Sequence, residues 1–295
     1  MSKKFRILRF FIILIIVAAI GAYAFTYFYL KSLSVPGGAE GYPVPEQRVN
    51  VVVMGIAKSL SDTIMLCSFD MKENTLDVYS IPRDTYYPSK RNYKGANAKI
   101  NASYGRGGAD DVVKSVEDLT GVPVHYYVKV DYKAVKAIVD AVGGIKVEIP
   151  LNMDYDDPAD DLHIHFKKGE VVQSGDDMIK ILRYRKNNHG GGYAEGDLGR
   201  IKMQQQVVKL GIQKVLDGNL VANFVKLQNP IQENVKTNMS PKQMMYYITK
   251  AAKIKTENIS INTIPGEAKL QHGLWYFVAD KDKMAEELAG IKDEK

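Results

Sequence analysis

The longest uninterrupted hydrophobic stretch lies near the N-terminus. Phe10 to Leu30 contains no charged residue, and as a helix rising about 1.5 Å per residue it roughly matches the hydrocarbon core of a bilayer. The basic residues in front of it are Lys3, Lys4, Arg6 and Arg9, and tyrosines cluster near its far end. This pattern predicts a cytoplasmic tail at residues 1–9, one transmembrane signal anchor at 10–30 and an extracellular remainder, with the protein a single-pass plasma-membrane protein. Ala22-Tyr23-Ala24 has the form of a signal-peptide cleavage site, but the apolar run continues past it, which favours a retained anchor.

After a linker at 31–47 that is rich in Pro and Gly, residues 48–295 alternate apolar strands with helix-length periodic segments. We expect one three-layer α-β-α domain with a mixed central sheet. Val49 to Met54 is apolar apart from Asn50, as in a central strand buried on both faces. Thr63 to Phe69 and Thr75 to Ile81 flank a polar turn and predict an antiparallel pair, which places Asp62 and Arg83 at the same end of the sheet.

Four further elements follow from periodicity and end signals. They are a helix over Asp110 to Thr120, a strand over Tyr126 to Val130, a helix over Tyr132 to Val142 and a strand over Ile145 to Ile149. Ser174 is expected to cap a short helix that ends near Arg183. A longer amphipathic helix begins near Leu198, with Asp197 as its expected cap.

The charge is unevenly distributed along the chain. The formal net charge is +6, but residues 1–31 hold five Lys or Arg and no acid, which leaves 35 basic against 34 acidic residues in the rest. A nearly neutral body lacks the basic stripe that nucleic-acid phosphates require, so DNA and RNA are excluded as expected partners. Cys67 is the single cysteine and lies in an apolar run, which indicates a core residue and no internal disulfide.

Several arginines stand at the ends of predicted elements. If Arg183-Tyr184-Arg185 is extended, both guanidinium groups point one way and the tyrosine ring the other. Arg200 and Gln204 are one turn apart at a helix N-terminus, where free backbone amides favour an anion. Any one of these residues could simply be solvated, but guanidinium groups suit bidentate binding of phosphate oxygens, so the set indicates a pyrophosphate site.

The ordered motifs resemble the LytR-CpsA-Psr family over about residues 48–217. The matching residues are Gly55, Ser61-Asp62-Thr63, Ser80-Ile81-Pro82-Arg83-Asp84, Lys99-Ile100-Asn101, Gly143-Gly144, Arg183-x-Arg185 and Gly196-Asp197-x-Gly199-Arg200-x-x-x-Gln204. The resemblance implies a phosphotransferase that moves a cell-wall glycopolymer, such as teichoic acid or capsule, from an undecaprenyl-pyrophosphate carrier to peptidoglycan and forms a phosphodiester. The competing interpretation is a non-catalytic polyprenyl-pyrophosphate-binding assembly or regulatory protein.

The resemblance also implies roles for individual residues. Arg83, Arg183, Arg185 and Arg200 would clamp the pyrophosphate, and Gln204 would donate a hydrogen bond beside them. Asp84 would orient Arg83 or accept the proton of the attacking hydroxyl, with orientation preferred. The apolar faces of the helices at Tyr132 to Val142 and Leu198 to Leu216 could line a lipid groove, although ordinary core packing explains the same pattern.

One expected magnesium ligand is missing. The family usually has an acidic residue shortly after the first strand, whereas this chain has Ala57 and Lys58 there. Asp62 matches the other carboxylate, so we expect weak Mg²⁺ binding that depends on substrate phosphate oxygens; alternatively, Lys58 supplies the positive charge to the pyrophosphate. His163 and His165 share a strand face without an evident third ligand, and the acidic loop 154–161 lacks an EF-hand pattern, so both are expected to be solvated surface.

Overall fold

The computed structural model describes residues 20–35, 37–38, 45, 47–89, 92–217 and 232–292. Residues 1–19, and with them the cytoplasmic tail and half of the predicted membrane span, lie outside this set. Within these ranges no helix is both long and apolar enough to cross a bilayer. A helix over residues 20–33 continues past the predicted span, and its Tyr29, Leu30 and Leu33 are buried in a cluster with Val49 and Phe69 of the central sheet.

The core of the protein is a mixed six-stranded sheet with the order β10-β3-β2-β1-β4-β9. Its strands are β1 (Arg48–Ala57), β2 (Leu60–Asp70), β3 (Thr75–Ile81), β4 (Tyr126–Val130), β9 (Val235–Thr237) and β10 (Ile259–Thr263). β1 is central and pairs antiparallel with β2 and parallel with β4. The predicted α/β class and mixed sheet are confirmed.

The antiparallel pairing of β2 and β3 is also confirmed. Ile64 lies opposite Ile81 and Asp70 opposite Thr75. The start of β2 and the end of β3 therefore meet at one edge of the sheet, which is where Asp62 and Arg83 stand.

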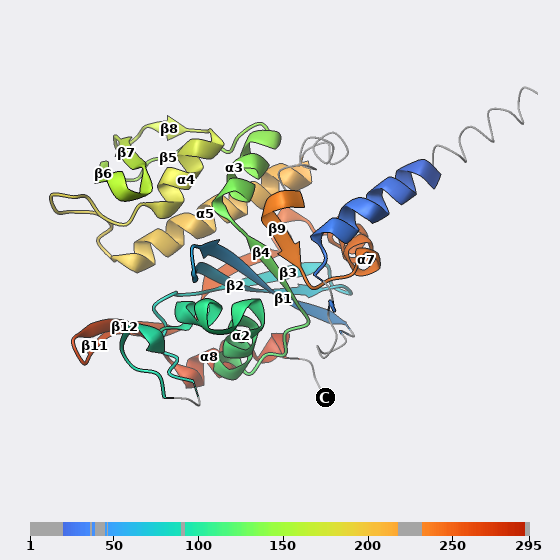
Figure 1. Ribbon diagram of the computed structural model, residues 1–295, viewed down its shortest axis with the longest axis horizontal. Coiled ribbons are helices and arrows are strands. Elements are labelled where there is room, and N and C mark those ends of the chain that lie inside the picture. The colour runs from blue at the N-terminus through green and yellow to red at the C-terminus, as the bar shows by residue number, and fades with distance from the viewer. Residues whose placement is uncertain are drawn as a thin grey trace, which may run out of the picture.

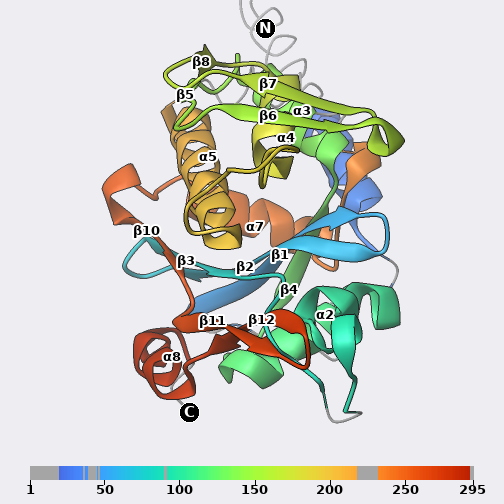
Figure 2. The same cartoon turned by 90° about the vertical axis from the view of Figure 1, so that its left-hand side faces the viewer.

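Helices cover both faces of the sheet (Figure 1, Figure 2). On one face lie α3 (Tyr132–Ala141), α4 (Gly175–Arg183) and α5 (Asp197–Asp217), and on the other lie α2 (Ser103–Thr120), α8 (Lys281–Glu287) and the hairpin of β11 (Gly266–Gln271) and β12 (Leu274–Ala279). Two hydrophobic clusters fill these layers, one between the sheet and α2 and α8 and one among α3, α4 and α5. α7 (Pro241–Ala251) packs near the N-terminal helix, with Met244 in the same cluster as Leu30.

The strand expected over Ile145 to Ile149 does not join the central sheet. Only β5 (Val147–Glu148) is a regular strand, and it pairs with β8 (Val171–Val172) outside the helix layer. A hairpin of β6 (Met153–Asp157) and β7 (Leu162–Phe166) lies beside it, with the short helix η3 (Pro158–Asp160) at the turn. The apolar residues in this region instead pack against α3 and α4, because that layer needs its own cover from solvent.

The helix expected over Asp110 to Thr120 begins earlier, at Ser103. It contains a kink at Gly107 and Gly108, where the backbone leaves helical geometry and Gly108 has φ 69°. A positive φ is accessible to glycine without a Cβ clash, so this pair lets two short helical segments join. The predicted cap at Ser174 is confirmed, because its side chain accepts a hydrogen bond from the Asp177 amide.

Asn50, the polar residue inside the apolar β1, joins this strand to two segments that are distant in the sequence. Its side chain is fully buried and donates to the carbonyl oxygens of Pro123, at 2.9 Å, and Ile291, at 3.3 Å. Its backbone amide donates to Nδ1 of His125 at 2.9 Å. Asn50 therefore connects β1 to the segment before β4 and to the C-terminal end of the described chain.

We expect Asn50→Ala to lower the free energy of unfolding by about 1–3 kcal/mol, because two buried carbonyl oxygens lose their donor. Urea denaturation followed by circular dichroism measures this. Lys114→Ala, on the exposed side of α2, is the control and should change stability by less than about 0.5 kcal/mol. Equal midpoints for Asn50→Ala and the parent protein would contradict a structural role for this side chain.

Candidate active site

Arg83 and Asp62, which the strand pairing places at the same end of the sheet, form an ion pair. Nη1 of Arg83 lies 2.8 Å from Oδ1 of Asp62, and both side chains are about four-fifths buried. The backbone of Arg83 is also held, because its carbonyl oxygen accepts a hydrogen bond from the amide of Asn101. The short helix η2 (Ile100–Ala102), part of the Lys99-Ile100-Asn101 motif, thus supports the turn that carries Arg83.

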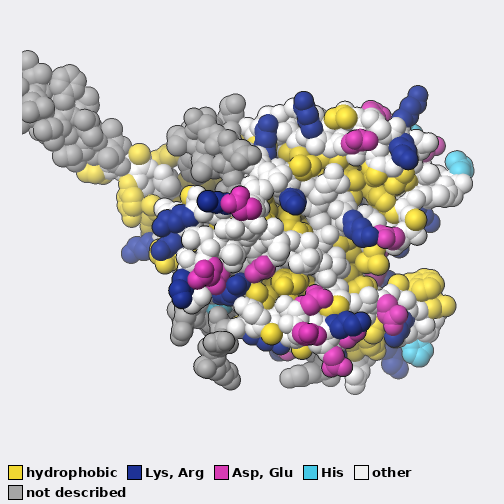
Figure 3. All heavy atoms as spheres, turned by 180° about the vertical axis from the view of Figure 1, so that it is seen from behind, with side chains coloured by type: hydrophobic (Ala, Val, Ile, Leu, Met, Phe, Trp, Pro, Cys, Tyr) yellow, Lys and Arg dark blue, Asp and Glu magenta, His cyan; other side chains and the backbone are white. Residues whose placement is uncertain are grey.

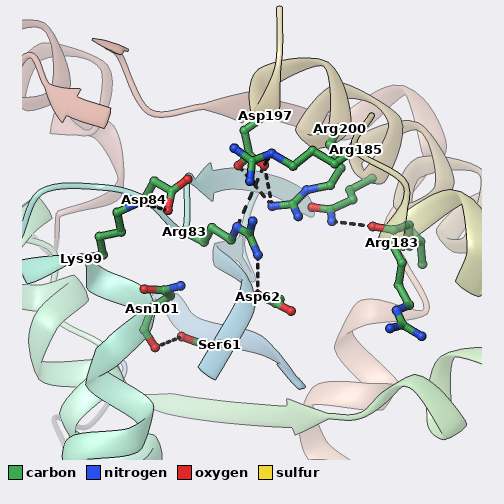
Figure 4. A network of polar contacts seen from close by, with 12 residues as sticks. Ser61, Asp62, Arg83, Asp84, Lys99, Asn101, Arg183, Arg185, Asp197 and Arg200 are labelled. Atoms are coloured by element: carbon green, nitrogen blue, oxygen red, sulfur yellow. Dashed lines mark hydrogen bonds and ion pairs between the residues drawn. The ribbon is translucent and has the colours of Figure 1, made fainter. Parts of the chain in front are cut away.

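Asp197 gathers three arginines at the start of α5 (Figure 4). Its Oδ1 lies 2.9 Å from Nη2 of Arg200, 3.7 Å from Nε of Arg185 and 4.0 Å from Nε of Arg83. These arginines come from α5, from the segment after α4 and from the turn after β3. The carboxylate that we expected to cap α5 therefore acts mainly as the shared counter-ion of the cluster.

The charges in this cluster are strongly coupled. Burial lowers the pKa of Arg83, but Asp197 and Asp62 outweigh it, so the pKa is raised above the usual value. Burial and the positive charge of Arg83 lower the pKa of Arg200. Nε of Arg83 and Nε of Arg200 are buried and have no hydrogen-bond partner among the described residues. The cluster therefore contains two buried donors that no described protein atom satisfies by a hydrogen bond.

Gly199 allows α5 to begin close to the loop that follows Arg185. A Cβ on Gly199 would lie 2.4 Å from Cβ of Tyr193, which no side chain tolerates. Tyr193 in turn packs edge-on against the ring of Tyr184, which is completely buried. Tyr184 is the residue between Arg183 and Arg185 in the sequence. The Tyr184 ring thus points inward. The expectation of an extended segment with both guanidinium groups on one side is wrong, because Arg183 is still part of α4 and pairs with Asp160, whereas Arg185 lies near Asp197.

Arg183 and Lys58 lie in a separate group around Asp160. Nη2 of Arg183 is 3.0 Å and Nζ of Lys58 is 2.7 Å from the carboxylate of Asp160 in η3. The guanidinium of Arg183 points away from the Asp197 cluster (Figure 4) and lies over the ring of Tyr132, 5.5 Å from its centroid. The four arginines predicted to clamp one pyrophosphate are therefore divided, with Arg83, Arg185 and Arg200 together and Arg183 to one side.

Tyr132, the first residue of α3, lies between the two groups. Burial raises the pKa of its hydroxyl, the charge of Asp62 raises it further, and Arg183, Arg200 and Arg83 lower it. The hydroxyl of Tyr132 thus senses the charges of both arginine groups, and its ring is in contact with Arg183.

Asp84 and Gln204 do not have the predicted neighbours. Oδ1 of Asp84 accepts a hydrogen bond from Nζ of Lys99 at 2.8 Å, so Asp62, rather than Asp84, is the carboxylate that orients Arg83. The amide nitrogen of Gln204 donates to the carbonyl oxygen of Leu182 at 3.2 Å. In this structure its donor therefore joins α5 to α4.

An apolar cavity of about 240 Å³ lies beside the arginines, between the sheet and helices α3 and α5. Both helices that were expected to line a lipid groove contribute to it. Lining residues from α3 include Tyr132, Val135 and Ile138, and those from α5 include Gln204, Val207 and Gly211. Because Tyr132 and Gln204 are also neighbours of the arginine groups, the polar cluster adjoins this cavity.

A second cavity, of about 220 Å³, lies on the other side of Asp197. Its polar lining includes Asp84, Arg185 and Asp197, and the β11–β12 hairpin adds Trp275 and Tyr276. Lys99 lies over the Tyr276 ring, 5.7 Å from its centroid, and Trp275 is 61% exposed. Carboxylates and aromatic rings thus face one space next to the arginines.

The site offers few free carboxylate oxygens to a magnesium ion. Asp62 and Asp197 both contact arginine, and Ala57 at the end of β1 supplies no ligand. Within the described ranges, the only cluster of three or more metal-ligating side chains lies elsewhere, at Asp156, His163 and His165. Of the two carboxylates that the family resemblance implies as magnesium ligands, this chain has only Asp62, whose Oδ1 is paired with Arg83.

Sequence reasoning missed four residues of the site: Tyr132, Asp160, Lys99 and the counter-ion role of Asp197. Asp197 stood in the Gly-Asp-x-Gly-Arg run three residues before Arg200, a spacing that places both on one helix face and could have indicated the pair. Lys99 stood in a recognised motif. Tyr132 gave no local signal, and the expectation that the acidic loop 154–161 is solvated surface is wrong for Asp160, which pairs with Arg183 and Lys58.

The chain was compared with known proteins. The model of the LytR_cpsA_psr family matches residues 43–292. The polyisoprenyl-teichoic acid–peptidoglycan teichoic acid transferase TagU of Bacillus anthracis is 35% identical over 224 residues, which are 76% of this chain and 69% of that protein. The crystal structure of TagV from B. subtilis has a TM-score of 0.68 at 26% identity and covers 84% of this chain and 97% of that chain.

A structure of TagT bound to LIIa-WTA has a TM-score of 0.66 and covers 88% of this chain and 97% of that chain. Its identity of 21% supports a common fold only. The family match extends beyond residue 217, where the recognised motifs end, and includes the β11–β12 hairpin and α8. This protein belongs to the LytR_cpsA_psr family.

Proposed function

We propose that this protein is a transferase that attaches a cell-wall glycopolymer, delivered on a polyprenyl pyrophosphate, to peptidoglycan. The observation that carries the proposal is the cluster of Arg83, Arg185 and Arg200 beside an apolar cavity. A polyprenyl pyrophosphate consists of a dianionic diphosphate and a hydrocarbon chain. The site places arginines, which suit the diphosphate, next to an apolar cavity, which suits the chain. TagU, the relative at 35% identity, is a teichoic acid transferase of this kind.

The chemistry requires charge stabilisation more than a protein nucleophile. A sugar hydroxyl of the acceptor attacks the phosphorus that bears the glycopolymer, the anhydride bond to the second phosphorus breaks, and polyprenyl phosphate leaves. The new bond is a phosphodiester, and the hydroxyl proton must go to a base. Fixed guanidinium groups in a water-poor site stabilise the negative charge that develops on the phosphate oxygens.

The two cavities suggest how the substrates are arranged. The hydrocarbon chain occupies the cavity between α3 and α5, and the acceptor glycan enters by the cavity at the β11–β12 hairpin. Asp84 faces that second cavity and is held there by Lys99. We assign Asp84 the role of accepting the proton of the acceptor hydroxyl, in place of orienting Arg83.

The roles of the remaining predicted residues follow from their positions. Arg183 and Lys58 would contact the outer part of the diphosphate or the first sugar from the Tyr132 side, after release from Asp160. Gln204 would hold α5 against α4, so that Arg200 and the apolar cavity keep their relative position.

The charge pattern at the N-terminus supports a site on the outer face of the plasma membrane. A basic tail at 1–9 and an apolar segment at 10–30 would anchor the chain with its N-terminus in the cytoplasm. The helix over residues 20–33 packs directly on the domain. Such an anchor would hold the lipid cavity near the bilayer from which the substrate comes.

The full chain in detergent, incubated with a short polyprenyl-pyrophosphate-linked saccharide, peptidoglycan fragments and Mg²⁺, should yield ligated product and free polyprenyl phosphate. Mass spectrometry detects both. We expect Arg83→Ala to reduce the rate by about two orders of magnitude or more, because one fixed donor to the developing charge is lost.

Arg48→Ala is the matched control, because Arg48 is also 19% exposed and paired with aspartates, but at the opposite end of the sheet. It should leave the rate within a few-fold of the parent. A near-normal rate for Arg83→Ala would remove Arg83 from the site. Binding of the lipid without turnover by the parent protein would favour the carrier-binding alternative.

For Asp84→Asn we expect a rate loss of roughly 10²- to 10⁴-fold with nearly unchanged affinity for the polyprenyl pyrophosphate, since the amide cannot accept the proton. Single-turnover rates and donor titration separate the two quantities. Asp77→Asn, a similarly buried aspartate on β3 paired with Arg48, is the control. An unchanged single-turnover rate in Asp84→Asn would exclude this role.

Magnesium binding is the last part of the proposal. When bound, Mg²⁺ would be held by Asp62 and substrate phosphate oxygens and would neutralise charge on the diphosphate. We expect calorimetry to show clearly tighter Mg²⁺ binding in the presence of a polyprenyl pyrophosphate, and Asp62→Asn to remove this increase. The same affinity with and without the lipid would reject substrate-dependent binding.

A further inference from the structure

The β6–β7 hairpin brings together two histidines and an aspartate that the proposed transfer reaction does not use. His163 and His165 are two residues apart on β7, so their side chains lie on the same face of the hairpin. Asp156 on β6 lies directly opposite His163. One ligand atom from each of the three side chains lies within 4.8 Å of the other two. The third ligand that the sequence did not reveal thus comes from the neighbouring strand.

The spacing of the donor atoms suits a tetrahedral metal ion. Ligands at about 2.0 Å from zinc lie about 3.3 Å from one another. Nε2 of His165 lies 3.3 Å from Oδ1 of Asp156, and Nδ1 of His163 is in direct contact with the same oxygen. The side chains are between 44% and 55% exposed, so small rotations can close the triangle without disturbing a core.

Each histidine also has a carboxylate near the ring nitrogen that is not needed for a metal, but only that of His165 is within hydrogen-bond distance. Nδ1 of His165 lies 2.8 Å from Oδ1 of Asp154, and Nε2 of His163 lies 3.8 Å from Oδ1 of Asp161. Metal-bound histidines usually donate their second N–H to such a carboxylate, which fixes the ring and increases its basicity. Two imidazoles and one carboxylate favour zinc over magnesium or calcium, which prefer oxygen ligands.

The β6–β7 hairpin contacts the segment around Arg183 and Arg185 in two places, through its turn and through β6. Its turn η3 carries Asp160, the partner of Arg183 and Lys58. Along β6, the amides of Asp154 and Asp156 donate to the side-chain oxygens of Asn187 and Asn188, in the loop after Arg185. A metal ion that fixes β6 against β7 would therefore limit the motion of η3 and of this loop.

We propose that Asp156, His163 and His165 form a zinc site, with His165 oriented by Asp154, that stiffens the β6–β7 hairpin next to Arg183. The site leaves a fourth position open to water or to a further ligand. Binding itself does not depend on the proposed transferase function, so it can be tested without a substrate.

Untagged full chain, stripped with chelator, should bind one Zn²⁺ per chain in competition with a chromophoric zinc indicator. We expect His163→Ala, His165→Ala and Asp156→Ala each to weaken binding at least about tenfold, and Asp154→Asn to weaken it by about 10- to 100-fold through the orientation of His165. His272→Ala, an exposed histidine in the turn of the β11–β12 hairpin, is the matched control and should bind like the parent.

The stiffening is measured by amide hydrogen exchange with and without Zn²⁺. Exchange in residues 153–166 and 186–192 should slow by several-fold, and exchange in the β11–β12 hairpin should not change. The site would be overturned if the parent bound Zn²⁺ with a dissociation constant above about 100 µM. It would also be overturned if the three ligand variants bound Zn²⁺ as tightly as His272→Ala. Binding without slower exchange in the hairpin would overturn the stiffening.

Discussion

The guanidinium groups of Arg83, Arg185 and Arg200 bring three positive charges close to one carboxylate, with Arg83 and Arg200 largely buried and Arg185 half exposed, and two aspartates make this possible. Without Asp62 and Asp197 the charges would repel one another, and each would lose its hydration with no compensation. With them the cluster is nearly balanced, and Nε of Arg83 and Nε of Arg200 are buried without a hydrogen bond to any described residue. Guanidinium groups that two aspartates hold in place would need little reorganisation to bind the diphosphate of the proposed substrate.

The cluster lies between two cavities that have different linings. Tyr132 and Gln204 connect it to the apolar cavity under α3 and α5, whereas Asp84 and Arg185 connect it to the aromatic cavity at the β11–β12 hairpin. A lipid-linked sugar has the same order of parts, with hydrocarbon, diphosphate and sugar in succession. The space-filling view in Figure 3 shows hydrophobic side chains gathered in patches between charged ones on one face of the molecule, so the surface chemistry also varies over short distances.

Strand pairing explains which parts of the site could be predicted. Asp62 and Arg83 flank an antiparallel pair with a short turn, and pairing rules alone place them at one sheet edge. That Arg185 and Arg200 belong to the arginine cluster was predicted from their positions at the ends of secondary-structure elements. The separation of Arg183 did not, because Asp160 lies in a loop whose position depends on how the β6–β7 hairpin packs. Likewise Asp84 is adjacent to Arg83 in sequence, yet its neighbour in space is Lys99.

The sequence by itself determined the antiparallel pairing of β2 and β3, the central position of β1, the ordered motifs of the family and the set of arginines, because these depend on local periodicity and on residues close together in the chain. Only the tertiary structure decided which carboxylate serves which arginine, that Asp197 is the common counter-ion, and that a cavity lies beside the cluster. Such contacts join residues more than 100 positions apart, as between Arg83 and Asp197. Their geometry is set by the packing of whole layers, which no local pattern records.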